Sequence, residues 1–240
     1  MKALPNASAV VRGRHGSSRL RRGPKFAVAA FAISVTVGLV VLSHASAAPP
    51  TTIDLGTAAS ASVLANSGVT NSGNSLLDHD VDSATGAIAG FPPGVTAGTL
   101  HLGDTTALDA QTDLSSAYNT AATETPTGDV TGIDLGGKTL TPGVYNATAS
   151  MSLTGTLPLT LNGPSDAVFV FQAGTTLITG ANASVVLMGG VQACNVYWQV
   201  GTSATVDAST AFSGNILAAD SITLNSGASL DGRALAETAR

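Results

Sequence analysis

Apolar and small polar residues alternate in short pieces over residues 165–236. This is the pattern of strands that bury one face. The pieces also repeat: residues 208–217 align with residues 226–235 at an offset of 18, and residues 171–177 align with residues 198–204 at an offset of 27. Because Gly, Ser, Asn and Asp separate the pieces, the pattern predicts a β-solenoid with three short strands in each turn.

The chain carries one pattern with a helical period, over residues 104–122. Asp104 or Thr105 can cap its N-terminus, and Leu108, Leu114 and Tyr118 recur at spacings that place them on one side of a helix. The pattern ends before Pro126. We therefore expect a single amphipathic helix that packs along one flank of the solenoid.

The N-terminal region has a different composition from the rest of the chain. Seven of the ten basic residues fall in the first 25 positions, an apolar run covers residues 26–42, and Ala45-Ser46-Ala47 follows. This order predicts a signal peptide over residues 1–47, with cleavage after Ala47 and a single domain over residues 48–240. The apolar run is close to the length of a membrane-spanning helix, so an uncleaved anchor is the alternative. After cleavage we expect a secreted chain without membrane insertion.

Acidic residues dominate the remaining chain, where three basic residues stand against all 15 acidic ones. Nucleic acid is excluded as a partner, because phosphate binding needs clustered Lys and Arg. The single cysteine, Cys194, cannot form an internal disulfide, and its apolar neighbours predict a buried, inert thiol.

Enzymatic chemistry finds little support in residues 48–240. Their possible general bases or cationic groups are His79, His101, Lys138, Arg233 and Arg240, and none stands at a recognisable spacing from acidic residues. GxSxG, HExxH, Walker and GxGxxG patterns are all absent from the sequence. We predict that the protein is not an enzyme and needs no cofactor, and that His101 is a packing residue.

One acidic run resembles a calcium-binding loop. Residues 78–82 read Asp-His-Asp-Val-Asp, but an EF-hand loop would need Gly at Ser83 and a carboxylate at Ala89. We therefore predict a solvated acidic turn and no dedicated metal site, with an adventitious cation site as the alternative.

Four segments carry a resemblance to a known family. They are DLGGKTLTPGVY from Asp134, DAVFVFQAGTTLIT from Asp166, QACNVYWQVGTSATV from Gln192 and FSGNILAADSITLNSGASLDGRALA from Phe212. Together with earlier pieces from Ile53 onwards, they resemble the microbial ice-binding protein family over residues 53–236. The resemblance implies a mainly β fold, namely a discontinuous, triangular, right-handed β-solenoid with one long α-helix packed alongside. It implies a monomer whose partner is the ice crystal surface, with thermal hysteresis and inhibition of ice recrystallisation.

The sequence departs from the family at its C-terminal side. Members usually continue past the GRALA-like segment with a further strand, whereas residues 237–240 read Glu-Thr-Ala-Arg. We therefore expect one edge of the core to be uncovered.

The alternation predicts which side chains could meet ice. Inward positions are Ala204, Val206, Ile222 and Leu224, so the outward positions of the same face are Thr176, Ser203, Thr205, Ser221 and Thr223. Repeats of ~6.7 Å along strands and ~4.7 Å between them would make a regular grid.

Other interpretations of these surfaces stay open. The same Thr and Ser residues also suit an ordinary wet strand surface. The face with Ser213, Ser229 and Asp231 is a competing site, and the bulkier face with Tyr197 and Gln199 is expected to meet the helix or solvent. The alternative function is an extracellular adhesin or structural module without ice activity.

Overall fold

Strands of successive turns pair in parallel throughout residues 49–237, which are the residues that the computed structural model describes. One turn comprises β16 (Val196–Val200), β17 (Ser203–Val206) and β18 (Ala211–Ser213), and the next comprises β19 (Asn215–Ala218), β20 (Ser221–Leu224) and β21 (Ser229–Asp231). The predicted 18-residue offset is the observed register: Ala204 pairs with Ile222, Phe212 with Leu230 and Leu217 with Leu235. The solenoid with three strands per turn is confirmed.

One side of the solenoid is a nine-stranded sheet. Its order is β7 (Leu100–Leu102), β4 (Asp80–Ser83), β1 (Ala61–Ala65), β22 (Ala234–Ala236), β19, β16, β13 (Phe169–Ala173), β10 (Gly143–Ala147) and β8 (Gly128–Asp129). All residues of β13 and β16 are buried. Burial of both faces explains their nearly continuous apolar sequences, as in other covered parallel sheets.

The other two sides consist of shorter sheets. The second side carries the four-stranded sheet β11 (Met151–Leu153), β14 (Leu177–Thr179), β17 and β20, and separately the pair β2 (Val69–Thr70) and β5 (Ile88–Ala89). The third side carries β15 (Val185–Met188), β12 (Leu159–Asn162) and β9 (Thr139–Leu140), the pair β18 and β21, and the pair β3 (Leu76–Leu77) and β6 (Val95–Thr96).

Aromatic side chains stack through the interior. Phe171 pairs with Trp198 in the register, which confirms the predicted 27-residue offset, and both are almost fully buried. Tyr145 lies on the other side of Phe171, with ring centroids 5.5 Å apart. These rings join the core that fills the triangle between the three sides.

Glycine repeats where the chain turns a corner. Gly214 and Gly232 occupy equivalent positions with φ values of 114° and 146°. A Cβ on Gly214 would lie 2.7 Å from Trp198 Nε1, and one on Gly232 would lie 2.2 Å from the Gly214 carbonyl oxygen. Both the backbone conformation and the close approach of neighbouring turns therefore require glycine here.

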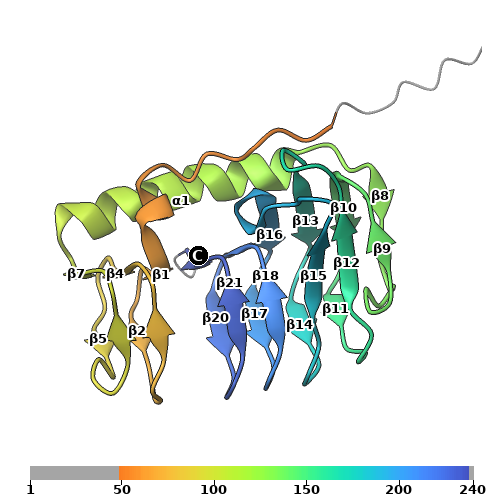
Figure 1. Cartoon of the computed structure of the whole chain (residues 1–240). Helices are drawn as coiled ribbons and strands as arrows, with labels where there is room; N and C mark the ends of the chain where they lie inside the picture. The colour runs from red at the N-terminus through yellow and green to blue at the C-terminus, as the bar shows by residue number, and fades with distance from the viewer. Residues whose placement is uncertain (1–48, 238–240) are drawn as a thin grey trace, which may run out of the picture. The chain divides into compact units, whose positions relative to one another are not determined.

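The predicted helix is present as α1 (Thr105–Thr123), within one residue of the expected bounds at each end. Asp104 caps it, since its side chain accepts a hydrogen bond from the Ala107 amide at 3.0 Å. Figure 1 shows α1 running along the nine-stranded sheet from its β7 end as far as β13, after which the chain continues to β8 at the other end. Its buried residues and those of the 3₁₀ helix η1 (Gly56–Ser60) form a second apolar cluster with the outer side chains of that sheet, such as Val170 and Tyr197. The prediction that the Tyr197 side meets the helix is confirmed.

The solenoid is discontinuous. In the nine-stranded sheet, β22 from the C-terminal region lies between β19 and β1, so the N-terminal turns stack on the C-terminal ones. α1 joins the two stacks covalently, because it leads from β7 at one end of the sheet to β8 at the other.

Within residues 49–237, this arrangement leaves one strand position unfilled on each of the other two sides. β20 and β2 belong to the turns of β19 and β1, which flank β22, yet nothing in residues 49–237 pairs between β20 and β2. A groove of about 270 Å³ lies there, and another of about 840 Å³ lies between the β3 and β21 regions. Figure 1 shows the same separation between β2 and β20.

The predicted uncovered edge of the core is therefore present among residues 49–237. It exposes Leu224, a side chain that the alternation places on the inner side of its strand. Val206 is fully buried, but its counterpart Leu224 is 40% exposed because no strand of residues 49–237 pairs on the far side of β20. Ile222 is half-buried at the same edge.

Two sequence expectations are wrong. Cys194 is exposed, because it lies in the short 3₁₀ turn η2 (Ala193–Asn195) at a corner and not in the strand that follows. Residues 80–83 form strand β4 within the nine-stranded sheet, and Asp82 is fully buried there, so the acidic run is not a solvated turn. The predicted signal peptide, residues 1–47, lies outside the described residues.

Candidate functional site

The outward side chains of the β11-β14-β17-β20 sheet make a continuous surface, which we call the four-stranded face. On the two C-terminal strands Ser203 pairs with Ser221 and Thr205 with Thr223. Ile178 on β14 pairs with Thr205 on one side and with Ser152 of the edge strand β11 on the other. Four in-register strands therefore repeat at ~4.7 Å, with ~6.7 Å between alternate residues of one strand.

All five residues predicted for this surface lie on it. Thr176 directly precedes β14, and its Oγ1 donates a hydrogen bond to Ser150 Oγ at 2.9 Å. Ser221 Oγ donates to Ser203 Oγ at 3.0 Å. Such bonds between neighbouring turns hold hydroxyl groups in fixed positions across the face.

Apart from Thr176, sequence reasoning missed the members of this face on and beside the first two strands. Ser150, Ser152 and Ile178 share the outward side with the predicted residues. A usable signal existed, because β11 pairs with β14 at an offset of 26 residues, close to the offset of 27 recognised for the next turn.

The middle of the four-stranded face carries no charged side chain, and carboxylates occur only at its rim. Asp207 accepts hydrogen bonds from the Ala208 amide and from Asn225, which lower its pKa. Asp134 lies beside Ser152 at the other edge. Burial raises the pKa of Asp134, but hydrogen bonds from Thr154 and from the Gly136 amide outweigh this effect, and its pKa is lowered.

The other two sides make less regular surfaces. The nine-stranded sheet is covered by α1. The third side is divided between the β9-β12-β15 and β18-β21 sheets, and Met188 and Asp231 project from it beside smaller residues. The competing site at Ser213, Ser229 and Asp231 therefore lies on a two-stranded piece and not on an uninterrupted sheet.

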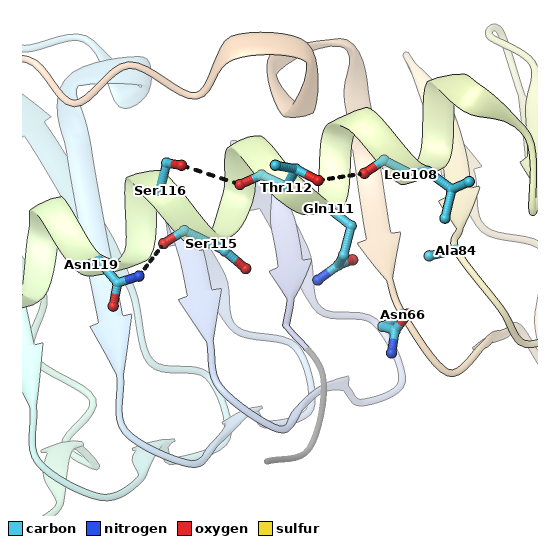
Figure 2. A pocket seen from close by; sticks show the side chains of 8 residues that line it. All are labelled: Asn66, Ala84, Leu108, Gln111, Thr112, Ser115, Ser116 and Asn119. Carbon is cyan, nitrogen blue, oxygen red and sulfur yellow. Dashed lines mark hydrogen bonds between the residues drawn. The ribbon is translucent and has the colours of Figure 1, made fainter.

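A shallow pocket of about 450 Å³ lies where α1 passes the ends of β1 and β4 (Figure 2). None of the side chains that line it is titratable: Asn66, Ala84, Leu108, Gln111, Thr112, Ser115, Ser116 and Asn119. The hydroxyls of Thr112 and Ser116 donate to helix carbonyl groups one turn back. The pocket thus offers neither a general base nor a charged anchor for a substrate.

One group of residues has the composition of a metal site. Asp80, Asp82 and His101 bring their ligand atoms within 4.8 Å of one another at the β4–β7 edge of the nine-stranded sheet. His101 Nδ1 lies 2.7 Å from Asp104 Oδ2, so this histidine makes a specific polar contact beyond the packing role that the sequence predicted.

Comparison with known proteins shows the family to which the chain belongs. A sequence model described as ice-binding-like matches residues 63–240. The chain belongs to the ice-binding-like family. The expected fold is confirmed at the same time, since solved structures of ice-binding proteins share it.

The relatives of this family member come from bacteria and fungi. An ice-binding protein of Nostoc sp. (strain HG1) is 50% identical over 185 residues, which cover 76% of this chain and 68% of the relative. The structure of an ice-binding protein from an Antarctic biological consortium aligns with a TM-score of 0.77 and 41% identity, and covers 80% of this chain and 87% of that one. The ice-binding protein of the Antarctic ascomycete Antarctomyces psychrotrophicus aligns with a TM-score of 0.75 and 39% identity, over 78% and 93% of the two chains.

Proposed function

We propose that this family member is a secreted ice-binding protein that adsorbs to ice through the four-stranded face, where Thr176, Ser203, Thr205, Ser221 and Thr223 contact the crystal. The adsorbed protein would cause thermal hysteresis and inhibit ice recrystallisation. The single observation that carries the proposal is the in-register grid of uncharged side chains, mostly Ser and Thr, on an uninterrupted sheet. The ice-binding names of the relatives support it.

The geometry suits the chemistry of an ice surface. Ice presents a flat, periodic array of water oxygens and no group that could enter a pocket. Hydroxyl groups spaced regularly on a rigid sheet hold a layer of ordered water, and such bridging water is nearly as favourable as direct hydrogen bonds. Strongly hydrated charged groups would disturb that layer of water. On the four-stranded face the carboxylates of Asp207 and Asp134 lie at the rim.

Secretion is part of the proposal, with residues 1–47 as a cleaved signal peptide and residues 48–240 as one domain. Among the residues that the structure describes, no helix is long and apolar enough to cross a membrane. Intact-mass analysis of the secreted protein should place Ala48 at its N-terminus. Recovery only from membranes, with residues 1–47 retained, would contradict this step.

The proposal also holds that the protein is monomeric and acts on ice without catalysis, nucleic acid or membrane insertion. The four-stranded face needs no second copy to complete its rows. The comparisons give no support to the alternative, an adhesin or structural module.

The direct test uses purified secreted protein at micromolar concentration. It should facet growing ice crystals, separate the freezing temperature from the melting temperature and slow recrystallisation in a frozen sucrose solution. Smooth, disc-shaped crystals and unchanged grain growth at every concentration would reject ice binding and favour the structural module.

A further inference from the structure

Beyond ice binding, we propose that Asp80, Asp82 and His101 form a binding site for a divalent transition metal ion of the zinc type. The site lies at the free edge of the nine-stranded sheet, on strands β4 and β7. Asp82 and His101 are direct partners in the parallel register, and one ligand atom from each of the three residues lies within 4.8 Å of the others.

Asp82 is the observation that points to a ligand. Its side chain is fully buried, and neither carboxylate oxygen has a hydrogen-bond partner within residues 49–237. Buried carboxylates are normally paired, hydrogen-bonded or bound to metal, because an isolated buried charge is very costly. Burial raises the pKa of Asp82 to about 6, while the nearby His101 opposes the shift. A bound cation would satisfy both oxygens at once.

His101 is oriented as metal-binding histidines usually are. Its Nδ1 lies 2.7 Å from Asp104 Oδ2, and Asp104 is itself held as the cap of α1, where its Oδ1 accepts from the Ala107 amide. A carboxylate that accepts the Nδ1 proton leaves the lone pair on Nε2, which can then bind a metal.

Asp80 completes the set from the solvent side. One oxygen, Oδ1, accepts a hydrogen bond from the Thr99 amide at 2.7 Å, which fixes the orientation of the carboxylate. Asp80 and His101 are partly exposed, so an ion can reach the site from solution.

The donor set selects the class of ion. One imidazole nitrogen and two carboxylates suit zinc and its first-row neighbours, with water in a fourth position. Calcium and magnesium prefer oxygen donors alone, and calcium takes six to eight of them. The ion would tie β4 to β7 and, through Asp104, to the start of α1, so we assign it a structural role at the end of the sheet.

Zinc titration of the secreted protein, after treatment with a chelator, tests the site. We expect binding of one Zn²⁺ per chain and, at a hundredfold excess over the dissociation constant, a rise in melting temperature of about 5–10 °C. Asp82→Asn and His101→Gln should each weaken binding at least tenfold. His79→Gln is the matched control, because His79 lies beside Asp80 but outside the cluster, and this variant should bind like the parent.

The unligated variants separate loss of a ligand from loss of folding. Without zinc, Asp82→Asn should melt at or above the temperature of the parent, because it removes an unpartnered buried carboxylate. Stoichiometric binding that disappears in Asp82→Asn at an unchanged or higher melting temperature supports the site. The proposal is overturned if the parent protein binds no Zn²⁺, or if Asp82→Asn binds as tightly as His79→Gln.

Discussion

The indole ring of Trp198 stacks on the ring of Phe171, with centroids 3.9 Å apart and planes inclined by 9°. The two residues occupy the same position in neighbouring turns, so the stack runs along the solenoid axis. Trp198 Nε1 also donates to the Ser213 carbonyl at 3.0 Å, which ties the nine-stranded sheet to the third side. The Trp198 side chain thus stacks on the neighbouring turn and also links two sides of its own turn.

We predict that Trp198→Ala lowers the free energy of unfolding by about 3–5 kcal/mol, because it leaves a large cavity and an unpaired carbonyl group. Tyr145→Ala is the control: Tyr145 belongs to the same stack but is only half-buried, so its loss should cost clearly less. Urea unfolding followed by circular dichroism measures both, since Trp198 is the only tryptophan and its loss removes the fluorescence signal. Equal costs would contradict a central role for the Phe171–Trp198 pair.

The contact between α1 and η1 includes one carboxylate that gives the fold a response to acid. Asp113 Oδ2 accepts hydrogen bonds from the Thr57 amide and the Thr57 hydroxyl, both at 2.7 Å, and these bonds lower its pKa. A lowered folded-state pKa means that the contact stabilises the fold above the unfolded pKa of about 3.9. That stabilisation is lost as the pH falls through the folded-state value.

We therefore predict that Asp113→Asn reduces the melting temperature at pH 7 and flattens its decline between about pH 5 and pH 2. Asp109→Asn removes the same charge one helical turn before Asp113, at an exposed residue that accepts no hydrogen bond from Thr57, and should keep the slope of the parent protein. Melting curves recorded at a series of pH values decide the matter. If the melting temperature of Asp113→Asn falls with pH as steeply as that of the parent protein, protonation of other groups causes the loss of stability in acid.

The sequence repeats made much of this architecture predictable. Because each turn places the same kind of residue at the same position of its strand, pairs such as Phe171 and Trp198 revealed the register directly. The helix was predictable because its apolar period is local and Asp104 marks its start. The outward position of Thr205 and Thr223 followed from strict alternation.

Other features depend on contacts that no local pattern records. The insertion of β22 between β19 and β1 joins residues such as Val63 and Ala234, which lie far apart in the chain and share no repeat. The acidic run around Asp82 resembles a loop by composition, and its pairing with β1 and β7 places it within the nine-stranded sheet. Those long-range pairings also bring Asp82 beside His101.

No strand of residues 49–237 lies next to β20 on its outer edge. Core residues of β20 should therefore contribute less to the free energy of unfolding than their counterparts on inner strands. Leu177 and Leu224 both lie on the inner side of the four-stranded sheet, but Leu177 is fully buried and Leu224 is 40% exposed. We predict that Leu177→Ala costs about 2–5 kcal/mol of unfolding free energy, whereas Leu224→Ala costs about 1 kcal/mol. Denaturant unfolding of the two variants measures the difference. A cost for Leu224→Ala as large as that for Leu177→Ala would mean that its side chain is covered in solution.

The last prediction concerns the four-stranded face. Thr205 lies between Ile178 and Thr223 in one row, so it is an inner position, whereas Thr223 lies on the edge strand β20. Adsorption to ice is a flat, collective contact, and one bulky side chain lifts its neighbours off the lattice. Thr205→Tyr should therefore abolish most of the thermal hysteresis and recrystallisation inhibition, and Thr223→Tyr should reduce both to a smaller extent.

Stability provides the internal check on that experiment, and the third side provides the control. Both variants should unfold within about 0.5 kcal/mol of the parent protein, because surface strand positions tolerate such changes. Ser229→Tyr introduces the same ring at an exposed position of β21 and should leave ice activity almost unchanged. If Ser229→Tyr removes activity while Thr205→Tyr and Thr223→Tyr keep it at an unchanged melting temperature, the protein meets ice through its third side, because only a ring at the contact surface can separate the remaining side chains from the crystal.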